Sequence, residues 1–292
     1  MPEWIVTPED AGCDLLEFLQ RRVPAAPAAY LRQLLKAGRV RRAGTPLAGA
    51  TVLAAGDEIL LPASRRLQDL LVQSGRQDLV ILHESAQILV VDKPAGLATH
   101  AGKGHEADNL TGRVEALLQR RGQRFMIAPI LRLDLETSGP VLFGKGRKSC
   151  SVLGRLMMAG GISKTYLALV DGHPAGEGSL LSQVPAKGTY KSAETVYKRL
   201  SGNAAASLVE IELRTGRQHQ IRRQFSDIGH PLYGDHRYRG RCPAQLRRLF
   251  LHCCRLGFAD PFADQPVRVR SPLPAELRDF LGQLGLSLPD MD

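Results

Sequence analysis

The 292-residue sequence has few cysteines, no apolar run of membrane-spanning length and no repeated or low-complexity segment. Its five cysteines form no C-x-x-C pair, and the adjacent Cys253 and Cys254 lack the spacing of a zinc knuckle, so we expect neither a metal site nor a disulfide. Free thiols are typical of a reducing compartment. The first ten residues also lack the apolar run of a secretory signal. We therefore expect a cytoplasmic protein without a membrane segment.

Two further segments suggest ligand sites that their surroundings argue against. His252 precedes the paired cysteines, but the apolar residues Leu251, Leu256 and Phe258 favour a buried strand over a metal ligand. The segment 139–146 matches G-x4-G-K of a phosphate-binding loop, yet it has glycine where Ser or Thr should hold Mg²⁺, and its middle is too apolar. We expect a buried strand there and no cofactor.

Positive charge dominates the sequence. Lysine and arginine number 39 against 29 acidic residues, which gives a net charge of +10 and makes polyanions the natural class of partner. Between Leu213 and Arg255 there are ten arginines, no lysine and two aspartates. A solvated basic face is one explanation, but arginine alone favours planar, bidentate contacts to phosphate. Charge does not distinguish RNA from DNA.

The first 65 residues predict a small basic module. Apolar spacing predicts helices over 14–22 and 28–37, and Glu58–Leu61 follows a Gly-Asp turn as a strand. Arg32, Lys36 and Arg39 fall at i, i+4 and i+7, as expected for one helical face that tracks phosphates, although solvated helices show the same pattern. The arrangement resembles the S4-type RNA-binding module, with RNA contacts expected at Arg32, Lys36, Arg39, Arg41 and Arg42.

The remaining chain predicts a second, larger domain. Residues 66–78 are polar and predict a linker, and 79–292 predict strands interrupted by helices without a βαβ rhythm. We therefore predict an α+β fold with a mixed, largely antiparallel sheet and flanking helices, preceded by the small α/β module. Helices are expected over 110–121 and 148–159, and strands over 79–82, 88–91, 165–170, 195–200 and 208–213.

Asp134 is the residue that most needs an explanation. Its neighbours Leu133 and Leu135 predict a desolvated carboxylate, which requires a cationic partner, and Arg222 is a candidate from a distant segment. Paired in this way, Asp134 would stay ionised at neutral pH. The alternative is a structural aspartate that bonds the turn at residues 137–138.

Three blocks occur in order: L-R-L-D-L-E-T-S-G from Leu131, K-T-Y from Lys164, and T-G-R-Q-H-Q-I-R from Thr215. Together they resemble the active-site motifs of the RluA-type pseudouridine synthases. The resemblance implies an isomerase that converts uridine in RNA to its C-glycoside without metal, ATP or redox cofactor. It also implies that Asp134 is the catalytic carboxylate and that the target nucleotide is flipped out of its stack.

The same resemblance implies roles for the other motif residues. Tyr166 would receive the flipped base, and it shares a strand face with Lys164 because the two residues are two positions apart; a core tyrosine is the alternative. Arg132 would fill the space that the base leaves. Lys164, Arg217 and His219 would meet phosphates or ribose, although His219 and Gln220 could equally cap or pack a helix.

The sequence departs from the family pattern at one motif position. The family commonly has histidine before the motif arginine, where this chain has Leu131. We expect altered substrate handling or local packing there, with catalysis retained. Residues 92–97 and 229–235 also match family patterns, and we interpret both as structural turns or loops.

The sequence therefore predicts a monomeric RNA pseudouridine synthase that acts on structured RNA. Ribosomal RNA is the first choice of substrate, and transfer RNA is the second. The rival hypothesis is a non-catalytic RNA-binding or ribosome-assembly protein that retains the fold. A hydrolase that pairs Asp134 with Glu136 is disfavoured, since alternate residues of an extended segment point to opposite sides.

Overall fold

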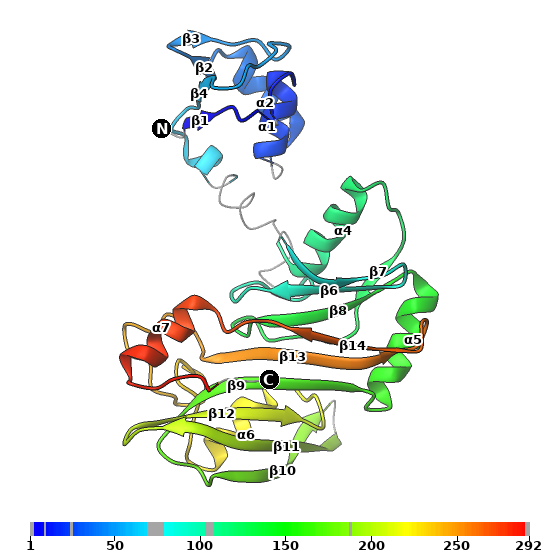
Figure 1. Ribbon diagram of the computed structural model, residues 1–292, viewed down its shortest axis with the longest axis vertical. Helices are drawn as coiled ribbons and strands as arrows, with labels where there is room; N and C mark the ends of the chain where they lie inside the picture. Colours follow the sequence, from blue (N-terminus) through cyan, green and yellow to red (C-terminus); the bar gives the residue numbers. More distant parts are fainter. Residues whose placement is uncertain are drawn as a thin grey trace. The chain divides into compact units, whose positions relative to one another are not determined.

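The computed structural model of the protein describes residues 3–8, 10–23, 26–68, 70, 79–102, 108–186 and 189–289. The chain divides into two compact units, an N-terminal unit of residues 1–78 and a C-terminal unit of residues 79–292 (Figure 1). Residues 69 and 71–78 of the expected linker lie outside the described part. No helix within the described ranges is long and apolar enough to cross a membrane.

The N-terminal unit combines two short helices with a small sheet. Asp14 begins the first helix by accepting a hydrogen bond from the backbone N–H of Glu17 at 2.7 Å. Both helices bury their apolar faces around Phe18, Leu31 and Ile59. The elements are β1 (Glu3–Ile5), α1 (Leu15–Arg22), α2 (Ala28–Lys36), β2 (Arg41–Arg42), β3 (Thr45–Pro46) and β4 (Glu58–Leu60), with sheet order β1-β4-β2-β3.

Helix α2 ends earlier than the basic spacing suggested. Gly38 takes a φ of 62°, and the N–H of Arg39 turns back to bond the carbonyl of Leu34 at 3.0 Å. Arg39 therefore lies beyond the helix, and the prediction that it continues the helical face of Arg32 and Lys36 is wrong. A glycine that reverses the chain outweighs the i+7 spacing.

The C-terminal unit has an α+β fold with two antiparallel sheets, which confirms the predicted fold class. The sheets have the orders β10-β11-β12-β9-β13-β14 and β5-β6-β8-β7 (Figure 1). In chain order the elements are β5 (Val80–Glu84), β6 (Ile88–Lys93), α4 (Leu110–Arg120), β7 (Ile127–Pro129), β8 (Gly139–Lys145), α5 (Arg147–Met158), β9 (Ile162–Asp171), β10 (Glu177–Ala186), β11 (Thr189–Gly202), β12 (Ala206–Leu213), α6 (Gln220–Asp227), β13 (Leu251–Asp260), β14 (Gln265–Arg270) and α7 (Ala275–Gln283).

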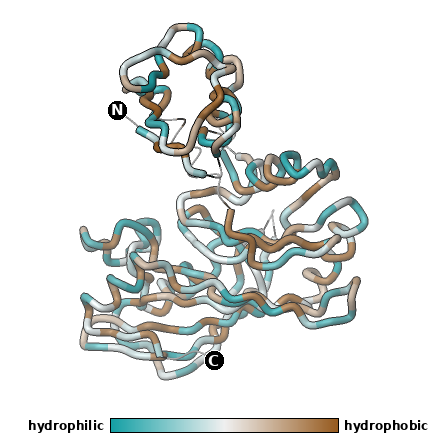
Figure 2. The backbone as a smooth tube through the Cα atoms, turned by 45° about the horizontal axis from the view of Figure 1, so that its top comes forward, coloured by the Kyte–Doolittle hydropathy of each residue, from teal (hydrophilic) through white to brown (hydrophobic). Residues whose placement is uncertain are grey.

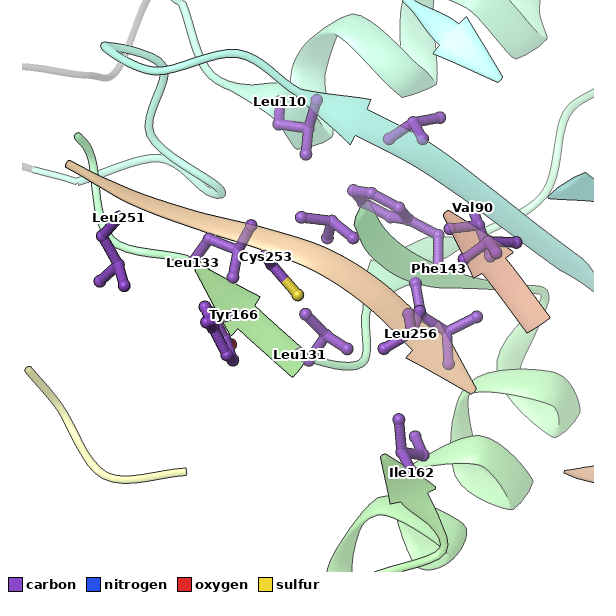
Figure 3. Close-up of a cluster of buried hydrophobic side chains, with 14 of the residues drawn as sticks. Val90, Leu110, Leu131, Leu133, Phe143, Ile162, Tyr166, Leu251, Cys253 and Leu256 are labelled. Carbon is purple, nitrogen blue, oxygen red and sulfur yellow. The ribbon is translucent and has the colours of Figure 1, made fainter. Parts of the chain in front are cut away.

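One hydrophobic core lies where the two sheets meet. Strand β8 is buried along its whole length, so residues 139–145 form a core strand, as predicted, and not a phosphate-binding loop. Figure 3 shows Leu131, Leu133 and Tyr166 close to Cys253 of β13, and all four side chains belong to this core. Brown, hydrophobic stretches alternate with teal, hydrophilic ones along the strands of this unit in Figure 2. The loop that carries Asp134 therefore follows directly from buried core residues, Leu131 and Leu133.

Candidate active site

A pocket of about 380 Å³ opens in the C-terminal unit and gathers the three sequence blocks. The loop before β8, strand β9 and the start of α6 each supply part of its wall. Every motif residue expected at the site in this unit lines the pocket: Arg132, Asp134, Lys164, Tyr166, Arg217, His219 and Arg222. The fold therefore brings together residues that are up to 90 positions apart in the chain, since 222 − 132 = 90.

The loop that carries Asp134 is fixed by its backbone. The backbone carbonyl of Asp134 accepts the N–H of Thr137 at 3.1 Å and closes a turn, so that the Asp134 carboxylate is left for the pocket. Lys93 is fully buried beside this loop, and its Nζ donates to the carbonyls of Leu97 at 2.8 Å and Leu135 at 3.2 Å. The turn at 92–97 therefore supports the loop.

The loop is also joined to β13 at its C-terminal end. Ser138 donates to His252 Nδ1 at 2.9 Å, and His252 Nε2 donates to the carbonyl of Ser271 at 3.0 Å. Burial lowers the pKa of His252 to about 4, so its imidazole stays neutral. Arg248 Nη2 also donates to Ser138 Oγ at 2.7 Å. His252 is therefore a buried structural residue, as its apolar surroundings predicted.

Asp134 faces two nitrogen donors from the start of α6. Its Oδ2 lies 3.7 Å from Arg222 Nη1 and 3.8 Å from His219 Nε2. The Asp134 side chain is 27% exposed, and Leu135 is exposed while Leu133 is buried. The expectation of a desolvated carboxylate is therefore wrong, because only one of the two flanking leucines covers it.

Arg222 makes its hydrogen bonds with another acid. Its Nε and Nη2 donate to the two carboxylate oxygens of Asp235 at 2.7 and 2.8 Å, and Asp235 is fully buried. Burial opposes the charge of Arg222, but the hydrogen bonds and charge of Asp235 raise its pKa, and the charge of Asp134 adds to this. The loop 229–235 thus carries a residue of the site, although its sequence indicated a structural role only.

The two residues at the start of α6 have different surroundings. The Gln220 side chain accepts from Thr215 Oγ1 at 2.8 Å and donates to the carbonyl of Glu194 at 2.9 Å, so it packs the helix against β11. His219 has a left-handed φ of 52° and turns its ring toward Asp134. Burial lowers the pKa of His219, and Asp134 only partly opposes this. The helix-packing alternative therefore applies to Gln220.

Tyr166 and Lys164 share the pocket face of β9, as their spacing predicted. Tyr166 is buried at 5% exposure and belongs to the core while it also lines the pocket. Burial raises its pKa well above the ordinary value, so the phenol stays protonated. Burial also lowers the pKa of Lys164. The site thus offers a fixed aromatic ring beside a buried amine.

The remaining expected contacts differ in exposure. Arg132 is exposed at the pocket, and Arg217 Nε donates to the carbonyl of Ser192 at 3.1 Å. Leu131, which replaces the usual histidine, is buried in the core.

In the N-terminal unit Arg32, Lys36, Arg39 and Arg41 are exposed, whereas Arg42 is paired with Asp57 at 2.5 Å. Among the described residues, no group of three His, Cys, Asp or Glu side chains could hold a metal ion.

Comparison with known proteins identifies the family. Residues 87–227 match the family model described as RNA pseudouridylate synthase. The chain is 31% identical over 307 residues to ribosomal large subunit pseudouridine synthase C of Escherichia coli K12, covering 96% of this chain and 95% of that protein. This chain belongs to the RluA-type RNA pseudouridine synthases. The synthase is therefore an RNA uridine isomerase, as the motif resemblance implied.

Two further similarities agree with this family. An uncharacterised RNA pseudouridine synthase of Bacillus subtilis, YhcT, is 31% identical to the synthase over 216 residues, covering 70% of this chain and 71% of that protein. The solved structure of human RNA pseudouridylate synthase domain containing 4 matches with a TM-score of 0.61 at 22% identity, covering 77% of this chain and 98% of that chain. The second similarity concerns the fold alone.

Proposed function

We propose that the synthase isomerises specific uridines in structured ribosomal RNA and that Asp134 is its catalytic carboxylate. The observation that supports this most is the convergence of Asp134, Tyr166 and Arg222 on one pocket from three distant segments. A relative of similar length is named for the large ribosomal subunit. Transfer RNA is the alternative substrate.

The reaction conserves atoms, so the side chains need only break and remake one bond to the sugar. The C1′–N1 bond of uridine breaks, the uracil turns in the pocket, and C5 bonds to C1′ while C5 loses a proton and N1 gains one. Asp134 acts either as the nucleophile or as the base that removes a ribose proton. Both routes act through the Asp134 carboxylate, and the hydrogen bonds of Asp235 hold Arg222 in place with its Nη1 at 3.7 Å from that carboxylate.

The pocket suits a flipped nucleotide. A base stacked in a duplex cannot reach Asp134, so the uridine must leave its stack. The pocket of about 380 Å³ is large enough for one base, and Tyr166 offers a buried ring at its wall. We assign base stacking to Tyr166. Arg132 would fill the space that the flipped base leaves in the RNA. Lys164, Arg217 and His219 would contact phosphates or ribose.

We also assign RNA affinity to the N-terminal unit, as an S4-like module. Four of its five expected cations, Arg32, Lys36, Arg39 and Arg41, are exposed. Arg42 contributes less because Asp57 neutralises it. We propose that the protein works as a monomer in the cytoplasm.

A matched pair of carboxylate variants tests the catalytic assignment. Asp134→Asn should reduce the rate by roughly 10³-fold or more, because the amide can act neither as nucleophile nor as base. Glu136→Gln, two positions away and outside the pocket lining, should stay near wild type. The measurement is pseudouridine mapping after incubation of purified protein with unmodified ribosomal and transfer RNA. An active Asp134→Asn protein would refute the catalytic assignment of Asp134. Modification of transfer RNA alone would refute ribosomal RNA as the substrate.

A further inference from the structure

Tyr238 contacts both nitrogen donors that face Asp134. Its hydroxyl lies 3.2 Å from His219 Nδ1, and its ring meets the imidazole edge to face, with centroids 5.8 Å apart and planes at 83°. The guanidinium of Arg222 lies 5.3 Å from the centre of the same ring. Asp235 fixes the backbone here, because its Oδ1 accepts the N–H groups of Arg237 and Tyr238 at 3.1 Å each.

His219 and Arg222 converge on one oxygen of Asp134. Both of their contacts, at 3.8 and 3.7 Å, go to Oδ2. No ion pair of the described residues involves Oδ1. Since His219 holds a left-handed φ of 52°, an unfavourable conformation for a non-glycine residue, the surroundings must keep it in place.

The groups around the imidazole differ in what each tautomer could offer them. A neutral imidazole has one N–H donor and one acceptor nitrogen, and an ionised carboxylate only accepts. If the Tyr238 hydroxyl donates to Nδ1, the proton lies on Nε2 and points to Asp134. The opposite tautomer would direct a lone pair at the carboxylate. Burial, Arg222 and Arg237 lower the pKa of the His219 imidazole, whereas Asp134 and Asp235 raise it. Burial therefore favours the neutral form.

We propose that Tyr238 is a positioning residue that fixes His219 as the Nε2–H tautomer and holds Arg222 against Asp134. Both donors then occupy Oδ2, and Oδ1 is presented to the nucleotide. The inference rests on the proposed role of Asp134 and adds to it the reacting oxygen, the tautomer and the residue that sets them. His219 then serves the carboxylate in addition to, or in place of, the RNA backbone.

Tyr238→Phe tests the hydroxyl while it keeps the ring over Arg222. We expect kcat to fall about tenfold, as for the removal of one hydrogen bond at the reacting group, while KM changes less than about twofold. Tyr238→Leu should reduce kcat further because the ring is removed. Tyr233→Phe is the matched control, since that hydroxyl bonds the carbonyl of Ala205 at 3.4 Å and lies outside the pocket lining.

A double-mutant cycle separates positioning from general loss of structure. His219→Gln keeps a donor near the place of Nε2 and removes the acceptor Nδ1, so adding Tyr238→Phe to it should cost little more. Additive effects of the two substitutions, or a Tyr238→Phe enzyme with wild-type kcat, would overturn the inference.

Imidazole ¹⁵N chemical shifts provide a readout that does not need activity. In ¹⁵N-histidine-labelled full-length protein, the His219 signals, assigned by their loss in His219→Gln, should show protonated Nε2 and acceptor Nδ1. In Tyr238→Phe they should shift toward a mixture of tautomers. An Nδ1–H tautomer in the wild type would refute the inference while leaving the catalytic role of Asp134 intact. Wild-type protein that modifies no RNA would instead refute the proposed function.

Discussion

A buried lysine supports the loop that carries Asp134. Lys93 is fully buried, and besides Leu97 and Leu135 its Nζ donates to the carbonyl of Pro94 at 3.0 Å. Burial, with the nearby charge of Arg248, lowers its pKa to about 7 from the ordinary 10.5, although Asp134 opposes the shift. Stability should therefore depend on pH through this residue.

The sign of this pH dependence follows from the number of protons that the folded and unfolded states bind. Between about pH 7 and 10.5 the unfolded chain holds a proton on Lys93 that the folded protein has released, so this residue makes the free energy of unfolding rise with pH in that window. Below about pH 7 both states are protonated, so Lys93 adds nothing to the slope, and the full free-energy penalty of burying its charge lowers stability there. Lys93→Met should remove up to about 1.4 kcal/mol of slope per pH unit, measured by urea unfolding from about pH 7.5 to 9.5. The exposed Lys198→Met is the control. Wild-type and Lys93→Met curves that run parallel would contradict this prediction.

Residue types and spacing predicted much of the site but not its supporting contacts. The seven motif residues all line the pocket because each motif lies at the end of, or within, an element that meets the others. Asp235, Tyr238 and the ammonium of Lys93 were missed as participants. Their contacts join segments that are distant in the chain or lie on an irregular loop, where no periodicity indicates which side chains meet. The available signals were the two family-like segments 92–97 and 229–235, which contain Lys93 and Asp235.

At the scale of elements, the entry into β8 depends on one glycine. Gly139 has a φ of 127°, and a Cβ there would lie 2.2 Å from the carbonyl oxygen of Cys253. The N–H of Cys253 bonds the carbonyl of Ser138 at 2.8 Å, so β8 and β13 approach closely at this point. The two sheets meet where the Asp134 loop ends.

Gly139→Ala should therefore destabilise the protein by about 3 kcal/mol, through strain and forced separation of β8 from β13. Gly154→Ala lies in the interior of α5, where an added Cβ meets nothing within 4 Å, and should stabilise the protein by about 0.5–1 kcal/mol. Urea unfolding of both variants provides the measurement. Equal effects of the two substitutions would refute the role of this close approach.

Helices and strands with a clear apolar pattern in the sequence were predicted. Elements that are stabilised mainly by contacts with other elements of the fold were not. Helices α1 and α4 and strands β6 and β12 were predicted within one or two residues. Strands β10 and β14 and helix α7 were missed. β10 has few apolar residues in its sequence E-G-S-L-L-S-Q-V-P-A and is stabilised by ten register pairs with β11. Such pairing comes from contacts between strands, which local propensity does not encode.

For the whole molecule, charge predicts how RNA binding depends on salt. Replacing Arg32, Lys36, Arg39 and Arg41 with glutamine in the full-length chain should weaken binding and flatten the plot of log affinity against log salt. The slope should fall by about 0.7–0.9 for each phosphate that the variant no longer neutralises. Arg21→Gln with Arg22→Gln is the control, since Glu17 and Asp10 already neutralise these residues. An unchanged slope in the fourfold variant would contradict the proposal that the N-terminal unit binds RNA through these four side chains.

The bidentate bond between Arg222 and Asp235 also determines which arginine the nucleic acid can engage. A phosphodiester carries the same kind of oxygen pair as a carboxylate and would compete for any guanidinium within reach. Since Nε and Nη2 of Arg222 are already bonded to a fully buried acid, they are not available for a bidentate bond to an incoming phosphate. If Asp134 reacts as proposed, the modified RNA can leave without breaking an arginine–phosphate pair beside that carboxylate.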